Sequence, residues 1–207
     1  MLSPQQLDEY RQDIQFNATL CEIPFQFNTT WGIFSPREID AGTLLLLNYM
    51  QLSPSDDCFD LGCGYGAIGM TMASIANQGQ TLMADKDFMA VEYSNKNIGR
   101  NHISNAKAVL SNGFQHIDTQ QKFDVIASNI PAKVGKEMMS LMLHDAYSHL
   151  KPDGKLYVVT INGLRQYMKR NLNEIFGNYK KIKQGKSYTV AVATKHITIN
   201  HLYKTRK

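Results

Sequence analysis

Residues 58–69, CFDLGCGYGAIG, contain the first residues whose types and spacing could do chemistry. Glycines in such a stretch let the backbone turn sharply and come close to a ligand at the start of a helix. They include Gly62, Gly64 and Gly66. Asp60 precedes them, and a carboxylate there suits a positively charged group, such as the ammonium of an amino acid, better than a pyrophosphate. The stretch therefore predicts a ligand-binding loop whose ligand carries an amino-acid group.

Asp85 ends the next expected strand. A carboxylate at that place can accept two hydrogen bonds from ribose hydroxyls. A ligand that joins a nucleoside to an amino acid is S-adenosylmethionine, so the glycines and the two carboxylates predict this cofactor. The alternative is a tight turn followed by an aspartate that caps a helix or lies on the surface.

A second candidate site lies in residues 123–137, FDVIASNIPAKVGKE, where a short strand runs into Asn129, Ile130 and Pro131. The amide oxygen and a neighbouring backbone carbonyl could both accept hydrogen bonds from a planar amine, such as the exocyclic amine of guanine, and so orient its lone pair. Pro131 stiffens the turn and restricts Ile130 to extended conformations. The alternative is an ordinary turn between a strand and a helix.

From residue 58 onward, stretches typical of strands alternate with stretches typical of helices. The expected strands are 58–61, 80–85, 107–111, 123–128, 154–161, 179–184 and 187–195, and the expected helices are 66–77, 87–101, 136–150 and 164–176. This order predicts an α/β protein with a seven-stranded, mostly parallel sheet, helices on both faces and a terminal antiparallel hairpin. Upstream, residues 12–30 predict a β-hairpin and residues 41–50 a helix. Ligands of such sheets bind beyond the carboxyl ends of the strands, where both candidate sites lie.

The charge of the chain is unevenly distributed. Residues 1–150 carry 9 Lys and Arg against 16 Asp and Glu, whereas residues 151–207 carry 13 against 2. This excess predicts a polyanionic partner for the C-terminal part. The alternative is a solvated basic face followed by a frayed tail.

Several classes of protein are disfavoured by the composition. No apolar run is long enough to cross a bilayer, and the polar, acidic N-terminus does not read as a signal peptide, so we expect a cytoplasmic protein that does not enter a membrane. The three cysteines, Cys21, Cys58 and Cys63, include no Cys-x-x-Cys pair and favour reduced thiols. The spacing of the histidines does not suggest a zinc site, and no metal is expected.

The stretches CFDLGCGYGAIGMTMA, MADKD and FDVIASNIPAK together resemble class I S-adenosylmethionine-dependent methyltransferases. The upstream stretch WGIFSPREIDAGTLLLL is similar to a segment of the small-domain methyltransferase family, which includes bacterial enzymes that methylate guanine N2 in ribosomal RNA and compact archaeal relatives. The resemblance implies a Rossmann-like methyltransferase fold. We expect two parts of the chain, an N-terminal extension with the β-hairpin, residues 1–39, and a methyltransferase domain with a basic C-terminal tail, residues 40–207.

The resemblance also assigns roles to the candidate residues. It places Asp60, Gly62, Gly64 and Gly66 at the methionine half of the cofactor, Asp85 at the ribose, Asn112 at the adenine amine, and Asn129, Ile130 and Pro131 at the catalytic turn, with Asn129 also beside the cofactor. The family often has Asp at the position of Asn112, but an amide oxygen can accept the same hydrogen bond.

Ala132 departs from the family, which usually has an aromatic residue there on which a flipped base stacks. Three explanations stay open. Another ring, such as Phe34 or Trp31, supplies the stack, the substrate is not a stacked base, or catalysis has been lost.

We therefore expect an RNA base N-methyltransferase that acts on guanine N2 of ribosomal RNA. An N-methyltransferase of protein glutamine or of a small molecule is the first alternative, because the same asparagine motif serves amide nitrogens. A non-catalytic RNA-binding accessory protein with the same fold is the second. The oligomeric state is left open.

Overall fold

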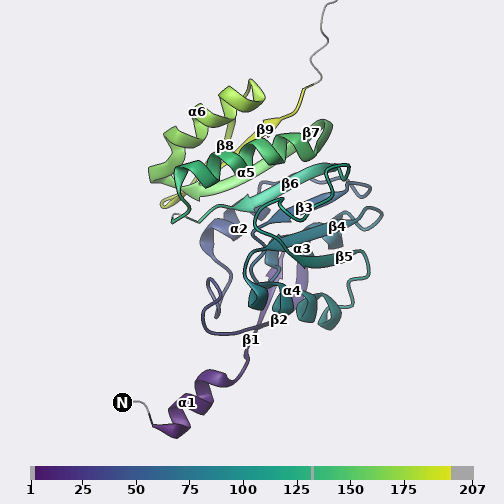
Figure 1. Ribbon diagram of the computed structural model, residues 1–207. Coiled ribbons are helices and arrows are strands. Elements are labelled where there is room, and N and C mark those ends of the chain that lie inside the picture. The colour runs from purple at the N-terminus through teal and green to yellow at the C-terminus, as the bar shows by residue number, and fades with distance from the viewer. Residues whose placement is uncertain (1–2, 132, 197–207) are drawn as a thin grey trace, which may run out of the picture.

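The computed structural model describes residues 3–131 and 133–196. It begins with helix α1, Pro4–Arg11, which projects from the body of the molecule (Figure 1). The helix starts with a capping box, in which the backbone N–H of Gln6 donates to Ser3 Oγ at 3.2 Å and the backbone N–H of Ser3 donates to Gln6 Oε1 at 2.9 Å. This helix is not among the elements predicted from the sequence, although Ser-Pro-x-Gln is a typical start signal.

Strands β1, Ile14–Leu20, and β2, Ile23–Thr29, form the predicted N-terminal hairpin. The hairpin packs on helix α4, Phe88–Arg100. Asn97 of that helix joins the two elements, because its Oδ1 accepts from the backbone N–H of Asn28 at 2.7 Å and its Nδ2 donates to the carbonyl of the same residue at 2.9 Å. The hairpin thus shares a core with the rest of the chain, while the predicted domain boundary at residue 40 stays a prediction.

The central sheet has seven strands in the order β5-β4-β3-β6-β7-β9-β8. Their bounds are β3 Cys58–Leu61, β4 Thr81–Asp85, β5 Ala106–Leu110, β6 Phe123–Asn129, β7 Leu150–Ile161, β8 Lys180–Gln184 and β9 Tyr188–Thr194. The strands from β5 to β7 are parallel, and β9 runs antiparallel to both of its neighbours, which confirms the predicted sheet and its terminal hairpin. The order reverses at β3, so the connections from β3 and β6 diverge and leave a crevice at the carboxyl edge.

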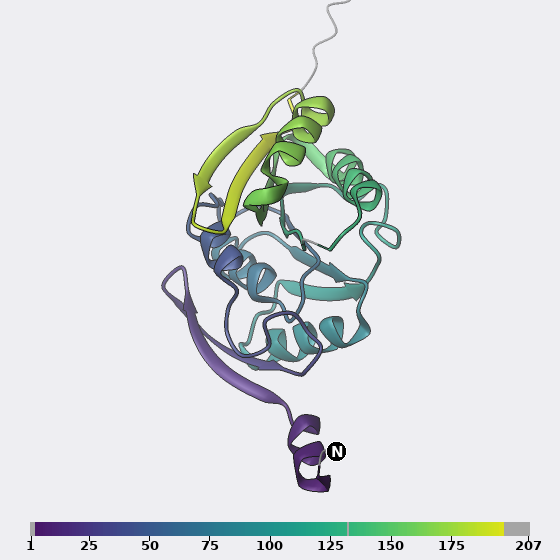
Figure 2. The same ribbon diagram turned by 90° about the vertical axis from the view of Figure 1, so that its left-hand side faces the viewer.

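Helices cover both faces of the sheet (Figures 1 and 2). One face carries α2 (Ala41–Leu47), α3 (Ala67–Ile75) and α4. The other face carries α5 (Lys136–His149) and α6 (Arg165–Phe176). A short 3-10 turn, Asn162–Leu164, precedes α6. The two faces have separate cores. Cys58 and Phe59 are adjacent and fully buried, yet they belong to different clusters because successive side chains of a strand point to opposite faces.

Most element bounds agree with the sequence patterns to within a few residues. Strand β7 differs most, since it begins at Leu150 instead of residue 154 and pairs irregularly with β6 between Phe123 and Val125. Within the described part of the chain, no helix has the length and hydropathy needed to span a bilayer. The expected cytoplasmic location stays a prediction.

Candidate active site

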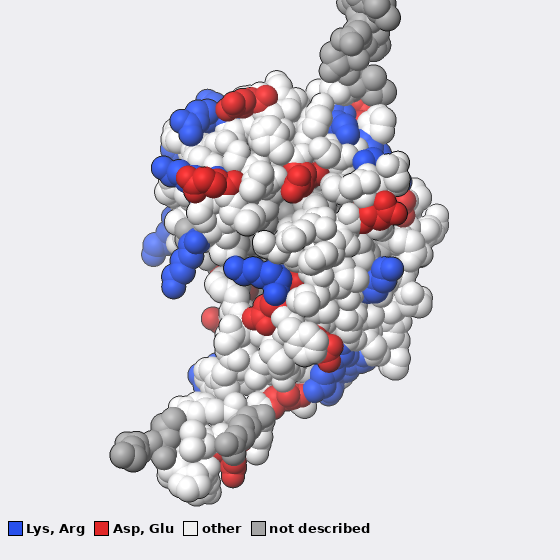
Figure 3. Space-filling model, viewed as in Figure 1, with Lys and Arg blue, Asp and Glu red and all other residues white. Residues whose placement is uncertain are grey.

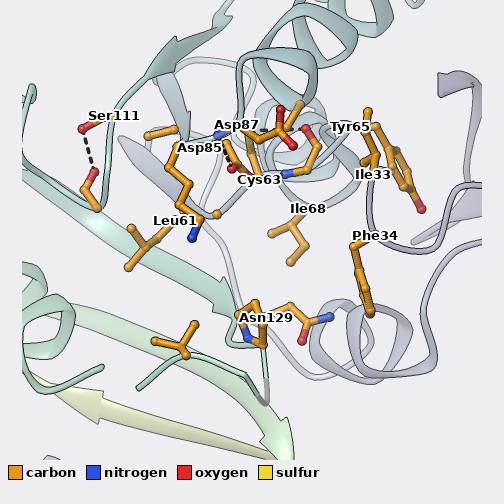
Figure 4. A pocket seen from close by; sticks show the side chains of 18 of the residues that line it. Ile33, Phe34, Leu61, Cys63, Tyr65, Ile68, Asp85, Asp87, Ser111 and Asn129 are labelled. Atoms are coloured by element: carbon orange, nitrogen blue, oxygen red, sulfur yellow. Dashed lines mark hydrogen bonds between the residues drawn. The ribbon is translucent and has the colours of Figure 1, made fainter. Parts of the chain in front are cut away.

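A cavity of about 310 Å³ lies at the carboxyl edge of the sheet, between the loops that follow β3, β4, β5 and β6 (Figure 4). The segment before α2 closes one side of it. Six of the residues predicted from the sequence line this cavity, namely Gly62, Gly64, Asp85, Asn112, Asn129 and Pro131. Three others, Asp60, Gly66 and Ile130, are close in sequence but do not form its wall. The structure therefore brings the two candidate sites together in one cavity.

The glycine loop joins β3 to α3 and exposes its backbone to the cavity. Gly64 has a φ of +56° with no atom within 4 Å of a hypothetical Cβ, so its backbone borders open space. Gly66, with a φ of +98°, is the N-cap of α3, and a Cβ there would lie 2.9 Å from Met83 Cε. The first glycine leaves room for a ligand, whereas the other is required by the turn and by packing on β4.

Asp60 lies beneath the glycine loop and is completely buried. Its Oδ2 accepts from the backbone N–H of Gly69 at 2.7 Å, and its Oδ1 has no hydrogen-bond partner among the residues that the structure describes. Burial raises the pKa of this carboxyl to about 7. An unpaired buried acceptor is unfavourable. Because Asp60 does not line the cavity, its contact with the predicted ammonium stays a prediction.

Asp85 connects the end of β4 to the glycine loop. Its Oδ2 accepts from the backbone N–H of Gly64 at 2.9 Å, and its Oδ1 accepts from that of Asp87 at 3.0 Å. Each carboxylate oxygen can accept more than one hydrogen bond, so the group can still bind hydroxyls from the cavity. In the next loop, Asn112 is exposed on the cavity wall beside Ser111, whose Oγ donates to the carbonyl of Gly113 at 2.9 Å and shapes the turn.

Asn129 ends β6 with its side-chain amide held from one side. Its Nδ2 donates to Asp40 Oδ2 at 2.9 Å and to Thr43 Oγ1 at 3.0 Å. A carboxylate only accepts hydrogen bonds, so Asp40 defines which end of the amide is nitrogen. Both amide hydrogens are therefore used, and the carbonyl oxygen of Asn129 is the end that remains for a donor in the cavity.

Asp40 is the N-cap of α2, and both of its carboxylate oxygens accept hydrogen bonds. Oδ2 also accepts from the backbone N–H groups of Gly42 at 2.8 Å and Thr43 at 3.2 Å, and Oδ1 accepts from the hydroxyl of Tyr188 at 3.0 Å. Gly42 is required beside this cluster, because a Cβ there would lie 2.8 Å from Asp40 Oδ2 and 2.9 Å from the ring of Tyr188.

Asp40, Thr43 and Tyr188 are absent from the candidate residues predicted from the sequence. A signal for the first two was present, because the Asp-Ala-Gly-Thr stretch is part of the segment that distinguishes the resembled family. Tyr188 carried no comparable signal. It begins β9, the last strand of the chain, which is far from Asp40 in the sequence.

The remaining predicted residues occupy the turn after β6. Ile130 is buried, and its backbone N–H donates to the carbonyl of Val159 at 3.0 Å, so this N–H is not available to a substrate. Pro131 lines the cavity. Ala132 lies outside the described residues, so the structure does not test the role expected for that position.

The two rings considered as replacements for the missing aromatic residue differ in placement. Phe34 lines the cavity, whereas Trp31 does not. The ring of Trp31 meets Tyr10 edge to face, with centroids 5.5 Å apart, and Arg37 lies 4.5 Å above it. Among the described residues, no group of His, Cys, Asp or Glu side chains is arranged to hold a metal ion.

Comparison with known proteins identifies methyltransferases as the relatives of this chain. The sequence model of the Methyltransferase small domain family matches residues 24–192. The chain is 32% identical over 174 residues to an uncharacterized protein, YbxB, of Bacillus subtilis, covering 83% of this chain and 86% of that protein. It is 33% identical over 173 residues to ribosomal RNA small subunit methyltransferase C of Hamiltonella defensa, covering 82% of this chain and 50% of that protein.

A solved structure shares the fold closely. The T. thermophilus 16S rRNA N2 methyltransferase RsmC, in complex with AdoMet and guanosine, superposes with a TM-score of 0.81 at 26% identity, covering 89% of this chain and 51% of that chain. The α/β fold and the cavity at the carboxyl edge of its sheet are those of a class I methyltransferase. The chain belongs to the Methyltransferase small domain family. It spans about half the length of the ribosomal RNA methyltransferases that it matches.

Proposed function

We propose that the protein transfers a methyl group from S-adenosylmethionine to the exocyclic amine of a guanine in ribosomal RNA. The observation that carries this proposal is the geometry of Asn129, whose amide hydrogens bind Asp40 and Thr43 while its oxygen is left to the cavity. A fixed acceptor of this kind suits a weakly nucleophilic planar amine, which needs orientation more than it needs a strong base.

The residues around the glycine loop fit the cofactor. Asp85 offers acceptors to a ribose, and Asn112 offers a polar side chain to an adenine edge. Asp60, buried beneath the glycine loop with one unpartnered carboxylate oxygen, would add negative charge near the ammonium group. S-adenosylmethionine, when bound, supplies an electrophilic methyl group on a sulfonium. Several carboxylates line the cavity, and they favour a ligand that carries this positive charge.

Asn129 acts on the acceptor amine. Its carbonyl oxygen and the backbone carbonyl of Ile130 accept the two N–H groups and hold the nitrogen lone pair in one direction. Neither acceptor is basic enough to remove a proton first, so the contribution is orientation and stabilisation of the positive charge that develops on the nitrogen. Asp40 strengthens this effect, because its carboxylate polarises the amide that it holds.

RNA as the substrate is supported by the relatives and by the charge distribution. Lys and Arg side chains lie along the side of the molecule that carries α6, with acidic side chains among them (Figure 3), and the sequence of β8 adds further lysines. Lys180, Lys181, Lys183 and Lys186 are exposed there. None of these four lysines forms a salt bridge with residues 3–131 or 133–196, which leaves them available for phosphates.

The test is a labelling experiment with tritiated S-adenosylmethionine and extracts from cells in which the gene has been deleted. Small ribosomal subunits, large subunits, deproteinised RNA and total protein are offered as separate acceptors. We expect label in RNA, recovered as N2-methylguanosine after digestion. Label confined to the protein fraction would refute the RNA substrate and favour an amide acceptor, and label in another methylated nucleoside would refute guanine N2.

A further inference from the structure

Phe34 stands out among the residues that line the cavity, because 64% of its surface is exposed. The flanking apolar residues of the same loop, Ile33 and Ile39, are buried at 6% and 9% exposure. The loop therefore packs against the core through these two residues. The ring of Phe34 points away from the core, toward the rim of the cavity. Because this exposed ring also lines the cavity, it is available to contact a ligand there.

The loop around Phe34 is held firmly. Gly32 and Ser35, on either side of it, both have positive φ angles of 97° and 49°. Ser35 Oγ donates to the carbonyl of Glu38 at 2.7 Å, and the hydroxyl of Tyr65 donates to the same carbonyl at 3.1 Å. A non-glycine residue with positive φ is strained and persists only where the surroundings impose it. The ring is thus presented by a preorganised loop.

The position of Phe34 in the cavity separates it from the residues assigned to the cofactor. All four of Phe34, Asn129, Asp85 and Ser111 line the cavity; in Figure 4, Phe34 and Asn129 lie in the lower part of the view, whereas Asp85 and Ser111 lie in the upper part. The cavity therefore has a cofactor end and an acceptor end, and the exposed ring lies at the acceptor end with the amide that would receive the amine.

We propose that Phe34 is the surface on which the acceptor base stacks, so that the substrate is an unpaired purine whose ring contacts Phe34 while its exocyclic amine meets the oxygen of Asn129. This inference rests on the proposed function and defines its substrate as a planar base in place of a flexible amide side chain. The Asn-Ile-Pro-Ala stretch contains no ring of its own, so Phe34 would supply the planar contact from the other side. A base within a duplex cannot reach such a site, and the target must be single-stranded or extruded.

Trp31 provides a matched control. It lies in the same loop and is 40% exposed, but its ring is engaged with Tyr10 and Arg37 and does not line the cavity. Trp31→Leu and Phe34→Leu each remove one aromatic ring from the loop. Only Phe34→Leu alters the acceptor end of the cavity.

The experiment compares the native chain with Phe34→Leu, Phe34→Tyr and Trp31→Leu in single-turnover methyl transfer to ribosomal RNA from the deletion strain. Binding of S-adenosylmethionine is measured in parallel by calorimetry, and thermal unfolding reports the folded state. We expect Phe34→Leu to lower kcat/KM for RNA by about 5- to 100-fold, the range for loss of one stacked base. Its affinity for S-adenosylmethionine should stay within about twofold of the native value. Phe34→Tyr should keep most of the activity, and Trp31→Leu should behave like the native chain.

The outcomes separate this inference from the proposed function. A native kcat/KM in Phe34→Leu, with RNA still methylated, would overturn the stacking role and leave the proposed function intact. An equal loss in Phe34→Leu, Phe34→Tyr and Trp31→Leu would show that the loop matters only structurally, and would overturn it too. If the native chain methylates no RNA, the proposed function itself fails and the inference fails with it.

Discussion

The amide nitrogen of Asn129 lies 2.9 Å from Asp40 Oδ2, although the two residues are 89 positions apart in the chain. The same carboxylate oxygen caps α2 through the backbone N–H groups of Gly42 and Thr43. One side chain therefore both starts a helix and orients the amide at the end of β6. Because this contact uses the donor end of the amide, the acceptor end is left to face the cavity.

Asn129→Ala should lower the single-turnover rate of methyl transfer by roughly 10²- to 10³-fold, the effect of removing one preorganised polar group from a transition state. Affinity for S-adenosylmethionine should change little, because Asp60 and Asp85 carry most of the polar contacts expected for it. Rapid-quench transfer and calorimetry on the same preparation measure the two quantities. Transfer at the native rate would mean that Asn-Ile-Pro is only a turn.

Asn129→Asp should be destabilised in a pH-dependent way. The new carboxylate would face Asp40 at hydrogen-bonding distance, and two like charges so close cannot both ionise. The folded variant then holds a proton that the unfolded chain releases, so its free energy of unfolding, relative to the native chain, should fall as the pH rises. Urea unfolding at pH 5.5 and 8.5 measures this, with Asn129→Ala as the uncharged control. If the free energy of unfolding of Asn129→Asp differs from that of the native chain by the same amount at both pH values, the contact between positions 129 and 40 is contradicted.

Asp40→Asn separates the two roles of the carboxylate. Asparagine is as good an N-cap as aspartate, so α2 should be retained and stability should change little. The negative charge that polarises Asn129 is lost, and we expect kcat to fall by about tenfold, the scale of a single charge-assisted hydrogen bond, without a comparable change in the KM for RNA. Asp40→Ala should in addition lose about 1 kcal/mol of stability with the cap. Steady-state kinetics with urea unfolding distinguishes the variants, and an Asp40→Asn enzyme with native kcat would exclude the polarising role.

Asp60 should make the stability and the ligand affinity of the protein respond to pH in opposite directions. Burial raises its pKa from 3.8 to about 7, so between these values the folded protein holds a proton that the unfolded chain has lost. The corresponding stability is complete at low pH and is lost as the pH rises through about 4 to 7. The positive charge of S-adenosylmethionine would favour the ionised carboxylate beneath the loop, so we expect its binding to strengthen as the pH rises toward 7.

Asp60→Asn tests both parts of this prediction. Unfolding of the ligand-free protein in urea at pH 5 and pH 8 should show a smaller decline for the variant than for the native chain, by an amount on the order of a few kcal/mol. Calorimetry should show that the variant binds S-adenosylmethionine weakly at both pH values. Parallel declines in the two proteins would remove Asp60 from the explanation.

Lys181→Gln should weaken RNA binding in a salt-dependent manner. The lysine is exposed on β8, and each phosphate contact contributes about −0.7 to the slope of log affinity against log salt on single strands. We therefore expect a slope that is less steep by about that amount in filter binding between low and physiological salt. Lys107→Gln is the matched control, since this lysine is exposed on β5 at the opposite edge of the sheet. Identical slopes for all three proteins would favour the alternative that charges on β8 only protect an edge strand from aggregation.

The order of the elements and the place of the site followed from the sequence alone. Strands and helices alternate from residue 58 because short apolar runs and longer amphipathic runs have different periods, which neighbouring residues determine. Asp85 and Asn129 end parallel strands and Asn112 follows one, so topology alone predicts that they meet at the carboxyl edge. The resemblance added their roles, which no local pattern contains.

The tertiary structure alone decided how these residues are buried and hydrogen-bonded. Asp60 proved to be a buried carboxylate beneath the loop, outside the cavity wall, because its strand lies in the middle of the sheet. Asn129 acquired its orientation from Asp40, and that residue in turn contacts Tyr188, 148 positions away. Contacts across such separations depend on how helices and strands pack, which a one-dimensional pattern does not encode. For the same reason, the sequence left Phe34 and Trp31 equivalent, and only the fold of their loop placed one ring in the cavity and the other against Tyr10.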